Sequence, residues 1–171
     1  MADFIVTLHT YNVYLVILAG LVTTIWGFIL FFRTRSIAAG GAVSVSPAGE
    51  QEATPSIKVD LTVQNEEVKE RAKSWRIALT VTVVLALIQG VFGLTMVLLG
   101  LRPGRPDDSL YYLHFVYGGI VALVIPVATT YATGGKNRRR DILIYSIAAL
   151  ILTAAAVRAW MTGPAVFTLL P

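Results

Sequence analysis

The stretch that decides the fold is residues 110–130, which read LYYLHFVYGGIVALVIPVATT. It is long enough and apolar enough to cross the hydrocarbon core of a bilayer as one α-helix. His114 lies one turn inside its start, and Gly118 and Gly119 follow one turn later. The other histidine of the chain, His9, lies near the start of the first apolar run, which raises the question whether the two side chains meet.

Three further apolar runs resemble it in length and composition. The 171-residue chain is 56% hydrophobic and only 14% charged, with a mean hydropathy of +0.70. These values lie outside the range of soluble domains. We therefore predict an all-α fold, an integral membrane four-helix bundle of up-and-down topology. Residues 1–171 form a single domain, with helices at about 8–32, 77–101, 110–130 and 142–161.

The longest connection between spans, residues 33–76, has two different parts. Residues 36–64 are rich in glycine and proline, which predicts an exposed loop, with a short strand possible at 57–63 where apolar and polar residues alternate. Residues 65–76 carry many charges, which predicts a solvated helical stem before the second span. The apolar tail, 163–171, is expected at the membrane interface.

The basic residues indicate how the chain is oriented. Eleven of the 14 lysines and arginines fall in two connections, 33–76 and 134–141. Cytoplasmic loops are enriched in such residues, so both connections are predicted to be cytoplasmic and both termini outside. The expected location is the cell inner (plasma) membrane, as a multi-pass protein. The cluster Arg138–Arg140 is interpreted as a topology signal, and no nucleic-acid partner is expected.

Several kinds of chemistry are excluded by what the chain lacks. It contains no cysteine, which removes thiol redox chemistry, iron–sulfur ligation and covalent haem attachment. The spans contain no convincing acid–base pair, so no catalytic residues are predicted. The site that remains is built on histidine.

The two histidines of the chain, His9 and His114, fall at matching depths. Each lies at the outer end of its helix, the first and the third, and these helices are diagonal in an up-and-down bundle. Two imidazoles on opposite sides of a porphyrin are the axial ligands of a low-spin haem b iron. Gly118 lies one turn below His114, and Gly90 and Gly93 on the second helix could also make room for the ring. We predict a haem site with His9 and His114 as iron ligands and Gly118 and Gly93 in the cofactor-binding wall.

Other interpretations of the same residues stay open. Arg158, near the outer end of the fourth helix, is predicted to bind the cofactor by pairing with a haem propionate, and the alternative is that it extends to the outer headgroups. Histidines and tyrosines also occur in the aromatic belts of membrane proteins. Glycines in membrane helices usually mark close packing between helices.

The second and third spans resemble haem A synthase, a membrane enzyme built from two four-helix halves. The shared pattern runs from Gln89-Gly90 through Gly93 to Leu101, then across a short loop to Leu113-His114. The resemblance implies that His114 is a haem ligand and that His9 is the paired ligand. In the family's catalytic half a glutamate and an arginine flank the first histidine, but Val6 and Thr10 stand here. The resemblance therefore implies a cytochrome-b-like four-helix haem module rather than haem A synthesis.

The sequence favours one function and leaves two others open. The favoured function is haem-b-binding electron transfer, as a carrier or as a subunit of a respiratory or photosynthetic membrane complex. Its expected partners are the lipid bilayer, other membrane protein subunits and a quinol. The first alternative is a haem-free accessory subunit of a larger membrane complex. The second is a small transporter, against which the nearly uncharged spans argue.

Overall fold

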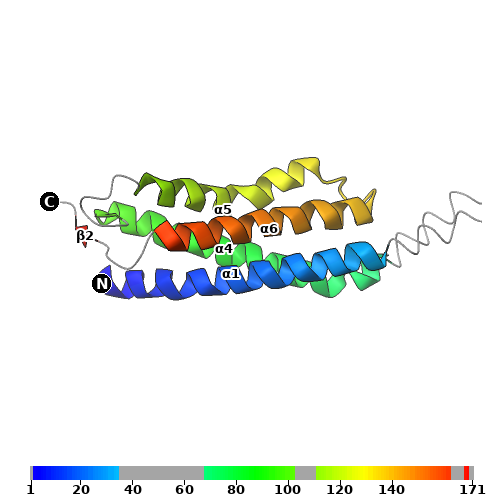
Figure 1. The fold of residues 1–171 in the computed structure, drawn as a ribbon, viewed down its shortest axis with the longest axis horizontal. Coiled ribbons are helices and arrows are strands. Elements are labelled where there is room, and N and C mark those ends of the chain that lie inside the picture. Colours follow the sequence, from blue (N-terminus) through cyan, green and yellow to red (C-terminus); the bar gives the residue numbers. More distant parts are fainter. Residues whose placement is uncertain (1, 35–67, 103–110, 163–167, 170–171) are drawn as a thin grey trace, which may run out of the picture.

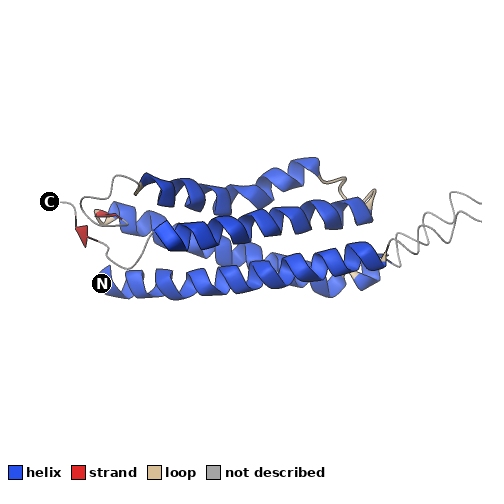
Figure 2. Ribbon diagram, in the orientation of Figure 1, coloured by secondary structure: helices blue, strands red, loops and turns tan. Residues whose placement is uncertain are grey.

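The computed structural model describes residues 2–34, 68–102, 111–162 and 168–169, and its main elements are four long helices (Figures 1 and 2). They are α1 (Ala2–Arg33), α4 (Lys73–Leu98), α5 (Tyr112–Tyr131) and α6 (Arg138–Thr162). Each is long and apolar enough to cross a membrane. The predicted all-α membrane bundle is confirmed.

The helices run alternately up and down, so the bundle has two distinct ends (Figure 1). We call the end with the start of α1 and the start of α5 the histidine end. The opposite end, with the end of α1 and the start of α6, is the basic end. Helix α1 packs against α4 and α6, and α5 packs against α6 but only loosely against α4. Helices α1 and α5 are therefore diagonal, as predicted.

Small side chains bring α6 close to α1 and make it the most buried helix. Ala148, Ala149 and Ala156 are almost fully buried in α6. A methyl group on Gly20 or Gly27 of α1 would overlap the side chains of Thr153 or Ser146. These two glycines allow the close helix packing typical of membrane bundles.

Polar contacts join α1 to α4 in the middle of the bundle and toward its basic end. The hydroxyl groups of Thr23 and Thr82 lie 2.9 Å apart and are buried. The indole N–H of Trp75 donates to the carbonyl oxygen of Thr23 at 2.9 Å. Since lipid offers no hydrogen-bond partners, such pairs satisfy polar groups that would otherwise be costly to bury.

Three helices begin earlier than the sequence predicted, at Ala2 rather than 8, at Lys73 rather than 77 and at Arg138 rather than 142. The charged first turns of α4 and α6 lie beyond the apolar runs, so hydropathy alone misses them. The side-chain oxygen of Asn137 accepts a hydrogen bond from the backbone N–H of Arg140 at 3.1 Å, which caps the start of α6. The described part of the predicted charged stem, from Val68 onward, is also largely helical.

The second span ends earlier than predicted, because α4 stops at Leu98 and not at Leu101. Gly100 adopts a left-handed conformation (φ 75°), and the chain then forms strand β1 (Leu101–Arg102). It pairs antiparallel with β2 (Thr168–Leu169), with Leu101 opposite Leu169. The pairing joins part of the tail to the end of α4. The predicted loop 36–64, its strand at 57–63 and the rest of the tail lie outside the described residues.

Candidate functional site

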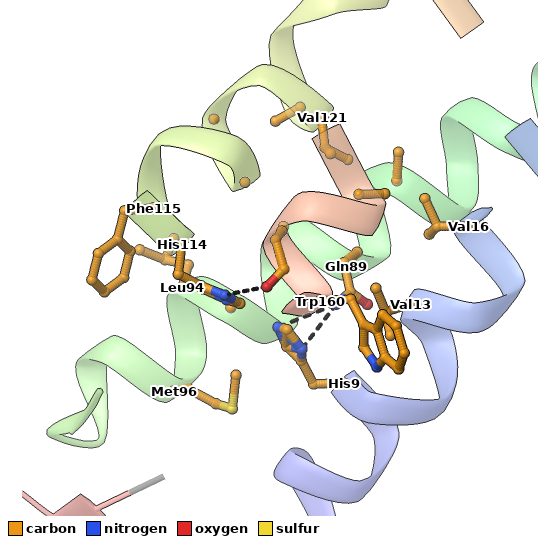
Figure 3. Close-up of a pocket in the computed structure, with 18 of the residues that line it drawn as sticks. His9, Val13, Val16, Gln89, Leu94, Met96, His114, Phe115, Val121 and Trp160 are labelled. Atoms are coloured by element: carbon orange, nitrogen blue, oxygen red, sulfur yellow. Dashed lines mark hydrogen bonds between the residues drawn. The ribbon is translucent and has the colours of Figure 1, made fainter. Parts of the chain in front are cut away.

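A cavity of about 740 Å³ opens at the histidine end, with walls from all four helices (Figure 3). Its volume falls within the range of small-molecule and cofactor sites. Most of its lining is apolar, including Val13, Ala86, Leu94 and Val121, and both histidines are part of it. The cavity is therefore suited to a largely apolar ligand held by a few polar groups.

His9 and His114 come together inside this cavity from the diagonal helices α1 and α5. Their ring centroids are 6.1 Å apart, and the ring planes are inclined by 29°. His9 is only 8% exposed, so it faces the bundle and not lipid. The predicted meeting of the two side chains is thus present in the structure.

The orientation of His114 is fixed by a backbone group on α6. Its Nδ1 lies 3.0 Å from the carbonyl oxygen of Ala159 (Figure 3). A carbonyl only accepts hydrogen bonds, so Nδ1 carries the proton and Nε2 of the neutral ring keeps its lone pair. Ala159 is among the last four residues of α6, whose carbonyls have no backbone N–H partner within the helix, and its oxygen also accepts from the Thr162 hydroxyl at 3.1 Å. The end of α6 thus orients His114 as metal-ligating histidines are oriented.

The position of His9 is supported by an amide pair linking α1 to α4. Gln89 Nε2 donates to the His9 ring, at 2.8 Å from Nδ1 and 3.2 Å from Nε2, so the lone pair of the neutral imidazole is taken up by this amide and would have to be released for His9 to bind a metal. Asn12 Nδ2 donates to the Gln89 side-chain oxygen at 2.8 Å. It also donates to the Leu85 carbonyl oxygen at 3.0 Å. Asn12 is buried, so the Asn12–Gln89 pair fixes the distance between α1 and α4 near the histidine end.

Four glycines line the cavity, and they differ from the packing glycines Gly20 and Gly27. A methyl group built on Gly90, Gly118 or Gly119 would have no neighbour within 4 Å. On Gly93 its nearest neighbour would be His9 Nε2, at 3.9 Å. These glycines are not needed for helix contact. Their missing side chains leave open space along α4 and α5, beside the two histidines.

Arg158 is the one predicted site residue that the structure places elsewhere. It is exposed, it is absent from the cavity lining, and its guanidinium lies 6.0 Å from the centre of the Tyr117 ring. This placement agrees with the alternative of an arginine that extends away from the bundle. The predicted pairing with a propionate has no direct support from its position.

In the described part of the chain, no three histidine, aspartate or glutamate side chains cluster as a metal site would require. The candidate site is limited to two imidazoles, a donor set suited to a metal that brings its own equatorial ligands. Comparisons with protein families, curated proteins and solved structures found no match for the chain. The functional argument therefore depends on the site itself.

Two contributors to the site were not recognised in the sequence. Gln89 was noted only as part of a motif, and its contact with His9 depends on the packing of α1 against α4. The Ala159 carbonyl is a backbone group with no residue-type signal at all. The predicted end of the fourth helix, at 161, lies one residue from the observed end at Thr162, so the carbonyls near this terminus could have been considered as partners of His114.

Proposed function

We propose that the protein binds haem b in the cavity at the histidine end, with His9 and His114 as axial ligands, and serves in electron transfer within a membrane. The observation that carries this proposal is the meeting of the two histidines of the chain across a large apolar cavity. Bound haem would supply one-electron chemistry.

The spacing of the histidines supports axial ligation. Imidazoles bound at about 2 Å to opposite sides of one metal ion place their ring centroids roughly 6 Å apart. The observed separation is 6.1 Å. His114 also has the proton on Nδ1 that ligation through Nε2 requires, because the Ala159 carbonyl holds it there.

The open wall supports a flat, bulky ligand. Gly90 and Gly93 on α4 and Gly118 and Gly119 on α5 leave room where other side chains would project into the cavity. The mostly apolar lining gives the histidines a low-dielectric surrounding, which tunes the potential of a bound redox group. The likeness to one half of haem A synthase, including His114, is consistent with the same proposal.

The proposed cellular setting follows from the charge distribution. The basic end carries Arg33, Lys73 and Arg138–Arg140, which favours a cytoplasmic position for that end. The cavity would then lie near the outer face of the plasma membrane. A quinol or another membrane subunit would be the electron partner at that level.

A haem-free accessory subunit is the second candidate, and the loose contact between α4 and α5 favours it. A helix from a partner subunit could occupy the space beside Gly90 and Gly118, because no side chain fills it. In that case the histidines would contribute polar contacts to an interface. The two candidates differ in whether the purified protein carries a chromophore.

An absorption spectrum of protein produced with ample haem separates them. We expect a Soret band and a reduced-minus-oxidised α band of b-type haem, both lost in His9→Ala and in His114→Ala. Tyr112→Phe is the matched control, since Tyr112 is at the same end but exposed and outside the cavity. A wild-type protein without a Soret band would refute haem binding.

A further inference from the structure

A second cavity, of about 410 Å³, lies at the basic end between the start of α4 and the turn that joins α5 to α6. Its lining contains three basic side chains, Lys69, Arg76 and Arg138, and one acidic side chain, Asp141. It differs from the histidine cavity in having charge on its walls. It also uses none of the residues of the proposed haem site.

The one acid of this cavity is engaged by the neighbouring turn. Asp141 Oδ1 accepts hydrogen bonds from the backbone N–H of Thr133 at 2.6 Å and from its hydroxyl at 2.9 Å. Asp141 Oδ2 accepts from the backbone N–H of Gly135 at 2.8 Å. Gly134 and Gly135 have positive φ angles of 63° and 89°, which this turn requires. The carboxylate therefore holds the turn together rather than pairing with the cations.

The two arginines are left with their charge directed to the cavity. Within the part of the chain that the structure describes, neither Arg76 nor Arg138 forms an ion pair with a carboxylate. The Arg138 guanidinium carbon lies 3.8 Å from where a methyl group on Gly135 would be, so it packs on the turn. Arg76 is exposed on the first turns of α4. The lining as a whole is positive.

We propose that this cavity binds the headgroup of an anionic phospholipid. Basic pockets between membrane helices recognise such headgroups, and guanidinium groups pair with phosphate through two parallel hydrogen bonds. The four spans place the basic end at the level of the headgroups. Leu79, Ala132 and Ile142 in the same lining offer apolar contact for the glycerol and the first acyl carbons. A soluble phosphate would make no use of that apolar part.

The test measures lipid retained by the full-length protein. The protein is purified in micelles doped with phosphatidylglycerol, or with phosphatidylcholine at the same mole fraction, and bound lipid is counted by native mass spectrometry. We expect preferential retention of phosphatidylglycerol, weakened about fivefold by Arg76→Gln and again by Arg138→Gln, as two charges near a membrane surface imply. Excess inorganic phosphate should leave the bound lipid in place.

Arg140→Gln is the matched control. Arg140 is exposed at the same end but does not line the cavity. Equal retention of the two lipids would overturn the proposal. It would also be overturned if Arg140→Gln weakened phosphatidylglycerol retention as much as the cavity variants do, because the lipid would then respond to the surface charge of this end in general. Displacement by inorganic phosphate would identify a soluble phosphate as the ligand instead. Arg76→Gln keeps the test valid if Arg138→Gln unfolds, because Arg76 is exposed.

Discussion

Alanine placed at two glycines of the bundle should have opposite effects on stability. Gly27 of α1 lies against α6, where a methyl group would overlap Ser146 and lie 2.8 Å from Trp75 Nε1. Gly118 of α5 faces the histidine cavity, with nothing within 4 Å of the added carbon. The same chemical change thus probes a packed interface and an open wall.

The structure allows the magnitude to be worked out for each variant. At Gly27, overpacking costs about 1–3 kcal/mol. Disturbing the hydrogen bond from Trp75 to the Thr23 carbonyl adds about 1 kcal/mol. The higher helix propensity of alanine returns about 1 kcal/mol. Gly27→Ala should therefore lose about 1–3 kcal/mol, whereas Gly118→Ala keeps only the propensity gain and should be unchanged or stabilised by up to about 1 kcal/mol.

The assay is reversible unfolding of the protein in mixed micelles, titrated with a denaturing detergent and followed by circular dichroism. Both variants are compared with the wild type at one lipid composition and without added haem, so that ligand binding does not contribute. A loss in Gly118→Ala as large as that in Gly27→Ala would refute the distinction. It would show that the glycines of the cavity wall are in close helix contact.

Four other variants test the site and the topology. Gly118→Leu should place a bulky side chain in the histidine cavity one turn from His114 and abolish haem retention in the absorption spectrum with unfolding unchanged; retained haem would contradict the assigned position. Gln89→Leu removes the amide beside His9, so we expect a loss of about 0.6 kcal/mol in the unfolding assay and a shifted haem reduction potential. An unchanged potential would show that the amide does not influence the ligand. The chain has no cysteine, so a single introduced cysteine can report on which side of the membrane it lies. Lys136→Cys should react with an impermeant thiol reagent only in inverted vesicles, and Asp3→Cys only in intact cells. The reverse pattern of labelling would contradict the predicted orientation.

The sequence was most informative where a property extends over many residues. Hydropathy over about twenty residues located all four spans, since each must match the thickness of a bilayer. Errors appeared at the ends, as at Lys73 and Arg138, where charged first turns continue a helix beyond its apolar part and, at Arg138, Asn137 caps the start. The pairing of β1 with β2 had no signal, because it involves two residues from each of two distant segments.

The candidate site was predictable only in part. The depth of His9 and His114 followed from helix direction, and helix order placed them across the bundle. The role of Gln89 and the Ala159 carbonyl depends on side-chain packing and on a helix end, which residue type does not encode. Arg158 was predicted to be part of the site because its depth is similar to that of the histidines, but its side chain is exposed and does not line the cavity.

The loose contact between α4 and α5 bears on the phase from which a ligand would reach the histidine cavity. Exposed residues of both helices, among them Leu94 and Phe115, are part of its lining, so the opening lies along the lipid-facing side of the bundle. An apolar ligand would enter by lateral diffusion after partitioning into the bilayer. Occupancy would then follow the mole fraction of ligand in the membrane rather than its aqueous concentration. Affinities measured for this cavity in detergent would accordingly change with the volume of the micellar phase.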